Sequence, residues 1–426
     1  MKRVVILCVW LFSVVAGHAQ LSLDECRRLA RENYPEIRQY DLVHQTEQYN
    51  LSNAARAWIP QIAFSAQATW QTDAPNFPKE LTGMLAQQGL EIPGLRKDQY
   101  KVALELNQTI WDGGKSVADK RIARAEAAEQ KTMTDVDLYE LEGRVDDLYF
   151  GILLLDERIA QTNLTLNLLR SNLEKVRALQ RNGVAMQSDA DVLEAELLSV
   201  GQQLIQFESS CDSYRRMLGI FIGQKVGDRK LQRPSAVQPL SGESARPELA
   251  MFAAKIDRLT AQEKMVKSSS MPRLRFFAQG YYGYPGLDYM QSMMNSDWSW
   301  NAMLGVKLSW NFGAYYTQKN NLNKLRISRQ QVEVQRDVFL FNMNLQAAQE
   351  NGDIARLRKA IADDDRIVAL RRSVREAAES KLRNGIIDTH DLLSKITDES
   401  TASMARSMRE IELLKAIYEY KHTINR

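Results

Sequence analysis

The sequence predicts a mainly helical fold with a small membrane β portion, built from an internal duplication. Three observations support this fold class. Similar segments occur in the same order in both halves of the chain, four segments alternate between apolar and polar residues, and two helical patterns run far beyond the usual length of a globular helix. The 426 residues are 44% apolar and 26% charged, which is an ordinary balance for a folded protein.

The beginning of the chain has the pattern of a signal peptide, which predicts export. Lys2 and Arg3 form a basic start, an apolar run follows over Val4–Val15, and Gly17-His18-Ala19 supplies the small residues of a cleavage site. We expect cleavage after Ala19. A membrane anchor is the alternative, but the apolar run is short for a helix that must cross a bilayer.

After this segment the chain has no run of eighteen consecutive apolar residues, so any membrane crossing must use strands. Cys26 and Cys211 both lie in helical patterns. Two cysteines do not make a disulfide framework, so we expect buried thiols, with a disulfide as the alternative for an exported protein.

Two repeats account for the mature chain. YPEI and RPEL carry Pro35 and Pro247, which lie 212 positions apart, whereas the later Arg-Asn-Gly segments lie 202 positions apart. About ten residues are therefore missing from the second half, and loops are where such changes are tolerated. The polar loop at residues 72–98, which corresponds to residues 285–297, is the expected place.

The repeats predict the domain boundaries. Residues 1–19 form the signal peptide, 20–225 the first repeat, 226–245 an equatorial linker and 246–426 the second repeat. Each repeat should contain a helix, two strands around a loop, a very long helix, a turn and a return helix. Ser22 and Glu25 form a capping box for a first helix over residues 22–58, and Pro60 and Pro272 lead into extended chain.

Four segments alternate with a period of two over roughly the length of a tilted membrane strand. One face of each segment is apolar: Ile62, Phe64, Ala66, Ala68 and Trp70; Val102, Leu104, Leu106 and Ile110; Leu274, Phe276, Ala278, Tyr282 and Tyr284; Trp300, Ala302, Leu304, Val306, Leu308 and Trp310. The opposite faces carry polar residues, among them Lys101, Glu105, Arg275 and Lys307.

Aromatic residues gather at the ends of these segments, which is typical of the girdles of outer-membrane barrels. The predicted girdle consists of Trp70, Trp111, Trp298, Trp300 and Trp310. A soluble β-sandwich is the alternative, because its strands also alternate. Membrane barrels begin at about eight strands and lipid forbids open sheet edges, so four strands per chain require several copies in one barrel. Three copies would supply twelve strands.

The segments after the second and fourth strands predict helices too long for a globular domain. Residues 115–180 contain no proline, and apolar residues recur at heptad spacing from Leu138 to Val176, which is typical of a coiled coil. At 1.5 Å per residue this helix is roughly 100 Å long. A return helix of about half that length follows, and residues 317–382 repeat the long pattern.

With these features the chain resembles the TolC-type outer-membrane efflux channel family (outer membrane factors) over nearly the whole mature sequence. The resemblance rests on SLDECRRLARENYPEI near the start, LNQTIWDGGK after the second strand, RNGVAMQSDADVLEAEL and RNGIIDTHDLL at two turns, and RPELAMFAAKI at the opening of the second repeat. It implies a homotrimer that shares a twelve-stranded β-barrel, with four strands per protomer, continued by a long α-helical barrel.

The resemblance also implies a location, a function and partners. The barrel would lie in the lipid of the cell outer membrane and the helical part in the periplasm. The channel would be a passive exit duct for small molecules or proteins in a tripartite efflux or type I secretion system. Its partners would be a periplasmic adaptor (membrane fusion protein) and an inner-membrane transporter of the resistance–nodulation, ABC or major-facilitator type.

The two Arg-Asn-Gly turns are where the resemblance assigns functional residues. The adaptor-docking turns would comprise Arg181, Asn182, Gly183, Asn384 and Gly385, and the periplasmic entrance or gate Ser188, Asp189, Arg383, Asp388 and Asp391. Asp391 matches an acidic position that rings the closed entrance, whereas Ser394 and Ile387 replace a second acidic residue and a basic latch partner. The structural alternative is that these glycines and aspartates only end and begin helices.

Other functional classes have less support. The histidines of the mature chain are scattered without metal-ligand spacing, and no phosphate loop or nucleophile elbow occurs. A net charge of +3 gives no basic field for nucleic acid. We therefore expect no enzyme and no cofactor. An exported structural or adhesive coiled-coil protein and a stand-alone porin remain as alternatives, but a porin would need more strands per chain.

Overall fold

The computed structural model describes residues 20–425 except 91 and 236–243, so the predicted signal peptide at residues 1–19 lies outside the described residues. The chain divides into two compact units. One comprises residues 41–131 and 251–334 and is called the strand unit below. The other, the hairpin unit, comprises the described parts of residues 1–40, 132–250 and 335–426. Each sequence repeat contributes to both units.

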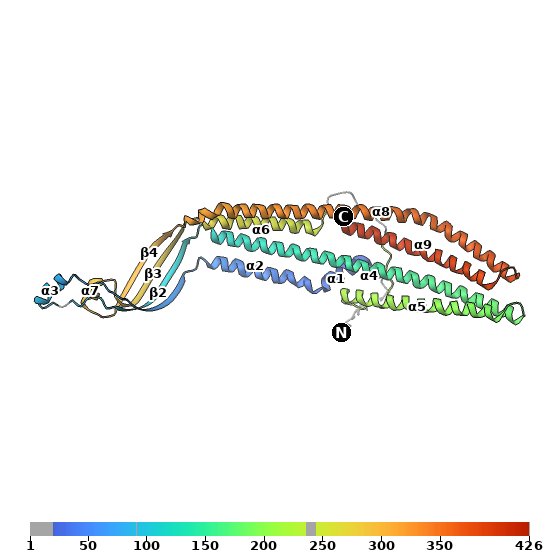
Figure 1. Ribbon diagram of the computed structural model, residues 1–426, viewed down its shortest axis with the longest axis horizontal. Helices are drawn as coiled ribbons and strands as arrows, with labels where there is room; N and C mark the ends of the chain where they lie inside the picture. The colour runs from blue at the N-terminus through green and yellow to red at the C-terminus, as the bar shows by residue number, and fades with distance from the viewer. Residues whose placement is uncertain (1–19, 91, 236–243, 426) are drawn as a thin grey trace, which may run out of the picture. The chain divides into compact units, whose positions relative to one another are not determined.

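The strand unit contains one antiparallel sheet with the strand order β1-β2-β3-β4. The strands are β1 (Gln61–Trp70), β2 (Asp98–Trp111), β3 (Arg273–Tyr284) and β4 (Ser299–Ser309). They agree with the four predicted alternating segments. Figure 1 shows the strands side by side, with the connections that carry the short helices α3 (Lys79–Gln87) and α7 (Tyr289–Met294) at one end of the sheet and long helices at the other.

The short helices correct the prediction that residues 72–98 and 285–297 are polar loops. Helix α3 follows Pro78, and α7 begins after Asp288, whose side chain accepts a hydrogen bond from the Gln291 N–H at 3.0 Å. A capping aspartate of this kind stabilises the start of even a short helix.

The predicted first helix over residues 22–58 is divided in the structure. It consists of α1 (Leu23–Asn33), a 3-10 turn at Pro35–Arg38 and α2 (Gln39–Arg56). Tyr34 has a ψ of 129° because a residue before proline is driven out of the α region, so Pro35 ends α1. The predicted cap at Ser22 is present, since its hydroxyl accepts a hydrogen bond from the Glu25 N–H at 3.2 Å.

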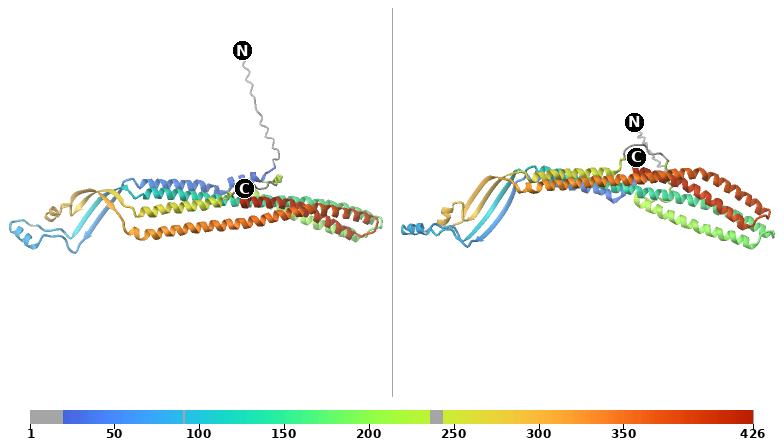
Figure 2. Two further views of the ribbon diagram at one scale, coloured as in Figure 1. Left: turned by 90° about the horizontal axis from the view of Figure 1, so that it is seen from above. Right: turned by 45° about the horizontal axis from the view of Figure 1, so that its top comes forward.

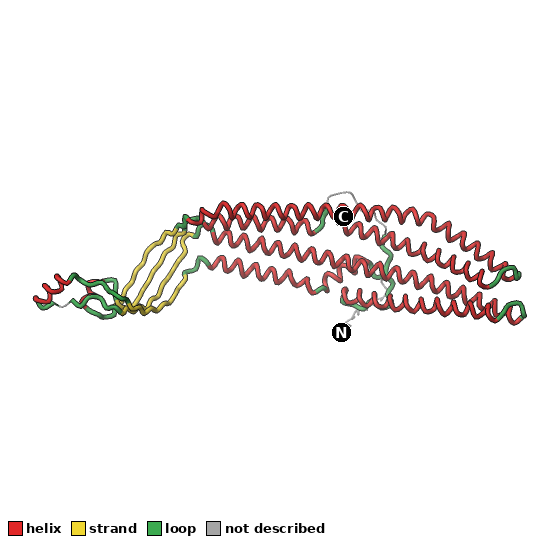
Figure 3. Tube along the Cα trace, in the orientation of Figure 1, coloured by secondary structure: helices red, strands yellow, loops and turns green. Residues whose placement is uncertain are grey.

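Two helices are far longer than the others, as predicted. Helix α4 (Lys115–Arg181) has 67 residues and α8 (Gly313–Arg383) has 71. Each is followed by a 36-residue return helix, α5 (Gln187–Ile222) and α9 (Thr389–Ile424), while α6 (Pro247–Ser269) precedes β3. The same order of helices, strands and turns therefore occurs twice along the chain, which is visible in Figure 3.

Helices in the strand unit are joined by ion pairs between neighbours. Glu47 of α2 lies 3.7 Å from Lys131 of α4, and Arg258 of α6 binds Glu129 of α4. Arg329 of α8 contacts Glu263 of α6 at 2.9 Å. None of the described helices is long and apolar enough to cross a membrane.

In the hairpin unit the main core lies where α1, α4, α5 and α9 meet. Its fully buried side chains include Leu138, Leu141, Val145 and Ile152, which confirms the predicted heptad seam of α4. The Tyr149 hydroxyl donates to the Leu21 carbonyl at 2.8 Å and so ties the beginning of the described chain to this core.

Both cysteines of the mature chain are free and buried in this core, as expected. Burial raises the pKa of Cys26 to about 12, so its thiol stays protonated at neutral pH. Burial also raises the pKa of Cys211, whose sulfur lies 3.3 Å from Asp156. Neither thiol has the exposure or the low pKa of a reactive cysteine.

The last turn of α9 is held by groups from three other segments of the hairpin unit. The Tyr139 hydroxyl and the Arg246 guanidinium both donate to the His422 carbonyl, at 2.5 and 3.3 Å. The His422 ring stacks on Tyr139 with ring centroids 4.1 Å apart, and Arg246 also lies over the ring of Phe339. Since a cation and a hydroxyl satisfy a free carbonyl at the helix end, this cluster stabilises the C-terminus of α9.

Candidate functional site: the strand sheet and the helix turns

The register of the sheet separates two faces except at the end of β2, where it shifts between Thr109 and Trp111. Elsewhere the odd-numbered residues of the four strands lie opposite one another, as in the pairs Gln67↔Lys101, Glu105↔Gln279 and Arg275↔Lys307. Even-numbered positions form the other face, where Phe64, Leu104, Phe276 and Leu304 are typical members. The predicted division into apolar and polar strand faces is therefore found in the three-dimensional sheet.

Exposure is inverted relative to a soluble sheet. On the apolar face Phe64, Leu304 and Trp300 are 71%, 75% and 81% exposed, whereas Ala103 and Tyr281 on the polar face are buried. The polar face is also hollowed, because a cavity of about 440 Å³ is lined mainly by its residues, including Glu105, Gln279 and Lys307. A large exposed apolar surface of this kind marks a face that another apolar medium must cover.

The predicted girdle residues lie at both ends of the sheet. Trp70, Trp298 and Trp300 are at the end that carries the α3 and α7 connections, and Trp111 and Trp310 are at the end that leads into the helices. At the first end Trp298 stacks with Tyr100 at 5.7 Å between ring centroids. At the other end the Trp310 indole N–H donates to the Ser270 carbonyl at 3.0 Å. Aromatic rings therefore flank the apolar band on both sides.

The two helix turns have the same backbone geometry. Gly183 and Gly385 have φ angles of +75° and +70°, in the left-handed region that favours glycine. In the first turn the Val184 N–H donates to the Leu179 carbonyl, and in the second the Ile386 N–H donates to the Lys381 carbonyl, each at 2.9 Å. Both hydrogen bonds satisfy the free carbonyls of a long helix. Both turns lie at the same end of the hairpin unit in the views of Figure 2.

The predicted gate residues lie at the starts of the return helices and at the end of α8. Asp388 is the N-cap of α9 and accepts a hydrogen bond from the Asp391 N–H at 2.8 Å, so Asp391 is three positions into the helix rather than its cap. Asp189 has the equivalent position in α5 and accepts from the Met186 N–H at 2.8 Å. Their carboxylates lie beside the positive end of a helix. Ser188 and Arg383 are exposed nearby.

Comparison with known proteins identifies the chain. Residues 27–223 match the family model described as "Outer membrane efflux protein". Over this stretch the chain is similar to the outer membrane efflux proteins, and it is called the efflux-protein homologue below. No curated protein gave a match by sequence.

Solved structures match this efflux-protein homologue over almost its whole length. The outer-membrane channel OprN matches with a TM-score of 0.70 at 14% identity, over 94% of this chain and 89% of that chain. VceC of Vibrio cholerae matches with a TM-score of 0.66 at 14% identity, covering 94% and 95% of the two chains. The open state of MtrE from Neisseria gonorrhoeae gives 0.64 at 14% identity, covering 94% and 88%. At such identities these structures show the fold.

The family match and the structures together confirm the predicted TolC-type resemblance, the mixed barrel fold, the efflux-channel function and the outer-membrane location. Outer membrane efflux channels form trimers and work with an adaptor and an inner-membrane pump.

The structure of the efflux-protein homologue adds turn residues that sequence reasoning missed. Val184 and Ile386 follow the two turn glycines directly and are 67% and 69% exposed. Met186, the N-cap residue of α5, is also exposed. An apolar residue directly after each Arg-Asn-Gly was a signal in the sequence, but exposure at a turn cannot be told from burial by periodicity.

A second missed feature is an ion-pair network that joins the two helical hairpins of the efflux-protein homologue. Lys175 of α4 contacts Glu379 of α8 at 3.3 Å, and Arg375 of α8 binds both Glu379 and Glu399 of α9. Burial raises the pKa of Glu379, but the hydrogen bonds and charges of Arg375 and Lys175 together outweigh it and hold that pKa below its ordinary value. The spacing of Arg375 and Glu379, four positions apart on α8, is a part of this network that is local in sequence.

Within the described residues, no three His, Cys, Asp or Glu side chains come together in a way that could hold a metal ion.

Proposed function

We propose that this efflux-protein homologue is the passive exit duct of a tripartite efflux or type I secretion system. Three copies would supply twelve strands to one barrel, and the long helices would form the periplasmic tube. The inverted sheet is the observation that carries the proposal, because an exposed apolar face and a hollow polar face suit a wall between lipid and an aqueous lumen. The five tryptophans would be its girdle at the two membrane surfaces.

The edges of the sheet support the need for further copies. The strand order leaves β1 and β4 each with one unpaired side, and lipid does not tolerate unpaired backbone groups. If β4 of one protomer pairs with β1 of the next, every strand gains two neighbours. We retain the repeat boundaries at 20–225 and 246–426, with the linker 226–245 between them, as the proposed domain organisation.

The two turns are the proposed docking tips for a periplasmic adaptor of the membrane fusion type. Gly183 and Gly385 shape the turns, Arg181, Asn182 and Asn384 border them, and the exposed Val184 and Ile386 offer apolar surface that a partner could cover. The transporter behind the adaptor would be of the resistance–nodulation, ABC or major-facilitator type. Since the chain is proposed to have no catalytic role, the energy would come from that transporter.

The proposed gate is formed by residues beside these tips. Ser188, Asp189, Arg383, Asp388 and Asp391 would lie around the entrance once three protomers are assembled. Asp391 is exposed and carries the charge that would face incoming solute. Three copies would bring three carboxylates close together, which favours binding of a multivalent cation.

Conductance in planar bilayers tests the proposed function. The purified full-length protein should form trimers that conduct, and Asp391→Ala should weaken block by a trivalent cation added on the tip side. Trimers that conduct with block unchanged by Asp391→Ala would remove Asp391 from the gate. A water-soluble monomer that never conducts would contradict the duct itself and favour the structural coiled-coil alternative.

A further inference from the structure

The polar face of the sheet carries an excess of positive charge that the channel function alone does not explain. Its five charged residues are Lys101, Glu105, Arg273, Arg275 and Lys307, at odd-numbered positions of β2, β3 and β4. Four cations and one carboxylate leave three net positive charges per protomer, and β1 adds none. Three protomers would place nine net positive charges around one lumen.

These charges are arranged without the compensation that folded proteins usually provide. Arg275 lies directly opposite Lys307 in neighbouring strands, and Arg273 lies two residues away on the same face. Like charges in opposing positions destabilise a sheet. In the described part of the chain the side chains of these three residues make no ion pair and no hydrogen bond.

The single carboxylate of this face is already engaged. Glu105 accepts a hydrogen bond from Gln279, whose side-chain oxygen in turn accepts one from the Lys101 ammonium at 3.0 Å. The Lys101 ammonium also lies 4.5 Å from the centre of the Tyr281 ring. The hydrogen bond of Glu105 is therefore made in the middle of the face. Arg273, Arg275 and Lys307, near the helix end of the sheet, have no ion pair with it.

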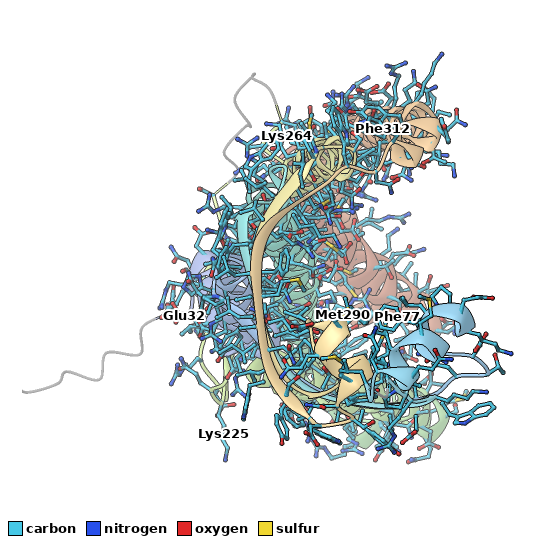
Figure 4. All side chains as sticks on the ribbon, turned by 90° about the vertical axis from the view of Figure 1, so that its left-hand side faces the viewer. Glu32, Phe77, Lys225, Lys264, Met290 and Phe312 are labelled. Carbon is cyan, nitrogen blue, oxygen red and sulfur yellow. The ribbon has the colours of Figure 1, made fainter. Side chains whose placement is uncertain are left out.

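The cavity places these cations around open space. It has a volume of about 440 Å³ and is lined by Arg275 and Lys307 together with Glu105, Gln279 and Met303. Figure 4 looks at the sheet from the end that carries Phe77 and Met290 and shows its curvature. A concave surface of one charge sign, with low-dielectric walls behind it, concentrates ions of the opposite sign.

We propose that the strand-lined part of the duct is an anion-selective filter formed by Arg273, Arg275 and Lys307. The solutes that it favours are anions such as small carboxylates, sulfonates and phosphates. This inference rests on the proposed function, since the polar face must line the lumen, and it names the substrate class of that same duct.

A cysteine placed in the filter can report on it without requiring an open entrance. Met303 lines the cavity and is 44% exposed, and Met84 of α3 is 67% exposed away from the sheet. In Met303→Cys and Met84→Cys, the rates of modification by an anionic (sulfonatoethyl) and a cationic (trimethylammonioethyl) methanethiosulfonate are compared in detergent-solubilised trimers. Cys26 and Cys211 are buried and should not react.

The anionic-to-cationic rate ratio should be higher at position 303 than at position 84. At low ionic strength we expect a difference of about tenfold, since a charged cleft raises the local concentration of counter-ions by at least this order. The difference should shrink at high salt, because the Debye length falls to about 3 Å at 1 M.

Charge variants assign the effect to named residues. Arg275→Gln with Lys307→Gln should lower the ratio at position 303 towards the value at position 84. Glu105→Gln keeps the shape of the side chain but removes its negative charge. This change should raise the ratio at position 303 above its value in the protein that keeps Glu105. Lys79→Gln removes one positive charge from α3, outside the sheet. It should leave the ratio at position 303 unchanged.

The outcomes separate this inference from the proposed function. Conducting trimers with equal ratios at positions 303 and 84, or a ratio that does not respond to the arginine and lysine changes, would overturn the filter and leave the duct intact. A chain that forms neither trimers nor conducting pores would overturn both. A ratio that moves in opposite directions for the Glu105 and Arg275/Lys307 variants would support the filter.

Discussion

At the residue scale, two glycines make the turns possible. A Cβ added at Gly183 or Gly385 would meet no atom within 4 Å, so space does not exclude a side chain. The positive φ angles are the obstacle, because an L-residue in this region is strained by its own backbone. The requirement for glycine at the turns is therefore one of backbone conformation.

Gly385→Ala should destabilise the second turn by about 1–2 kcal/mol for this reason. Gly201→Ala in the middle of α5, where a Cβ also meets open space, should stabilise the helix by about 0.5–1 kcal/mol. Hydrogen exchange of the amides around each site would measure both changes. A shift of protection in the same direction in both variants would show that backbone conformation does not set the requirement for glycine at the turn.

Another residue-scale effect concerns acid stability at the end of α9. The pKa of His422 is lowered from 6.5 to about 4, chiefly by burial and also by the charges of Arg246 and Arg27, while Glu248 and Asp147 act in the opposite direction. The unfolded chain takes up a proton near pH 6.5, whereas the folded chain does not until near pH 4. The free energy of unfolding should therefore fall as the pH drops through this interval.

His422→Phe should remove this fall, because phenylalanine can keep the ring stacked on Tyr139 but does not titrate. Hydrogen exchange of the last turns of α9 at pH 7 and pH 4.5, corrected for intrinsic rates, would reveal the difference. Neighbouring carboxylates are the same in both proteins, so their titration cancels in the comparison. Equal pH dependence in both would show that His422 is not the titrating group.

At the scale of elements, the sheet depends on which face each strand position occupies. Leu304 and Met303 are neighbours in β4 but lie on opposite faces, the apolar and the polar. Leu304→Lys should cost about 2–4 kcal/mol in a bilayer, since it places a charge against lipid near the middle of the strand. Met303→Lys should be tolerated because its side chain points to the aqueous face.

Urea titration in lipid vesicles would measure the free energy of unfolding of the Leu304→Lys and Met303→Lys variants. Equal stability of the two variants, or greater loss in Met303→Lys, would contradict the assignment of the faces.

The hairpins depend on a different element-scale feature, the ion pairs between α8 and α9. The side chains of Arg375 and Glu399 are only 13% and 11% exposed, and Arg375 also binds Glu379. Removal of the arginine therefore leaves two poorly solvated carboxylates, whose remaining partners are the more exposed Lys175 and Arg372. Arg375→Met should destabilise the hairpin by about 3 kcal/mol. Arg371→Met, which breaks the more exposed pair with Asp398, should cost no more than about 1 kcal/mol.

Limited proteolysis near the turns would measure both changes, since cleavage follows the population of the opened hairpin. A loss of about 3 kcal/mol corresponds to roughly a hundredfold faster cleavage. Similar cleavage rates in the two variants would mean that the buried network does not hold the hairpin.

The sequence was most informative about elements whose signal is periodic. Alternation placed all four strands, and the heptad spacing around Leu138 placed α4, because each pattern repeats many times within one element. Single-residue signals were harder to use. Pro35 divides the first helix, and the capping role falls to Asp388 rather than Asp391, although both residues were visible in the sequence.

Contacts between distant segments could not be predicted from local pattern. Glu399 and Arg375 are 24 positions apart and belong to different helices, so their pairing depends on the packing of the hairpin. The opposition of Arg275 and Lys307 likewise needed the strand register, although both had been placed on polar faces. The exposure of Val184 and Ile386 depends on the turn conformation, and their side chains alone do not reveal it.

At the scale of the whole molecule, a barrel shared between copies depends on the two edges of the sheet. Within one chain β1 and β4 are separated by two strands, and strands in a sheet lie about 4.8 Å apart. Cysteines in β1 and β4 of the same chain are therefore too far apart for a disulfide, which requires Cα atoms within about 7 Å. A disulfide between these strands can form only between copies.

The most direct test is a set of disulfide pairs between the two edges. Ala63→Cys in β1 would be combined in turn with cysteine at Asn301, Met303, Gly305 or Lys307 of β4, in protein oxidised in the outer membrane. We expect at least one pair to give dimers and a covalently closed trimer on a denaturing gel, with no product beyond the trimer. Monomers alone from all four pairs, or a ladder that continues past three chains, would contradict a barrel shared by three copies.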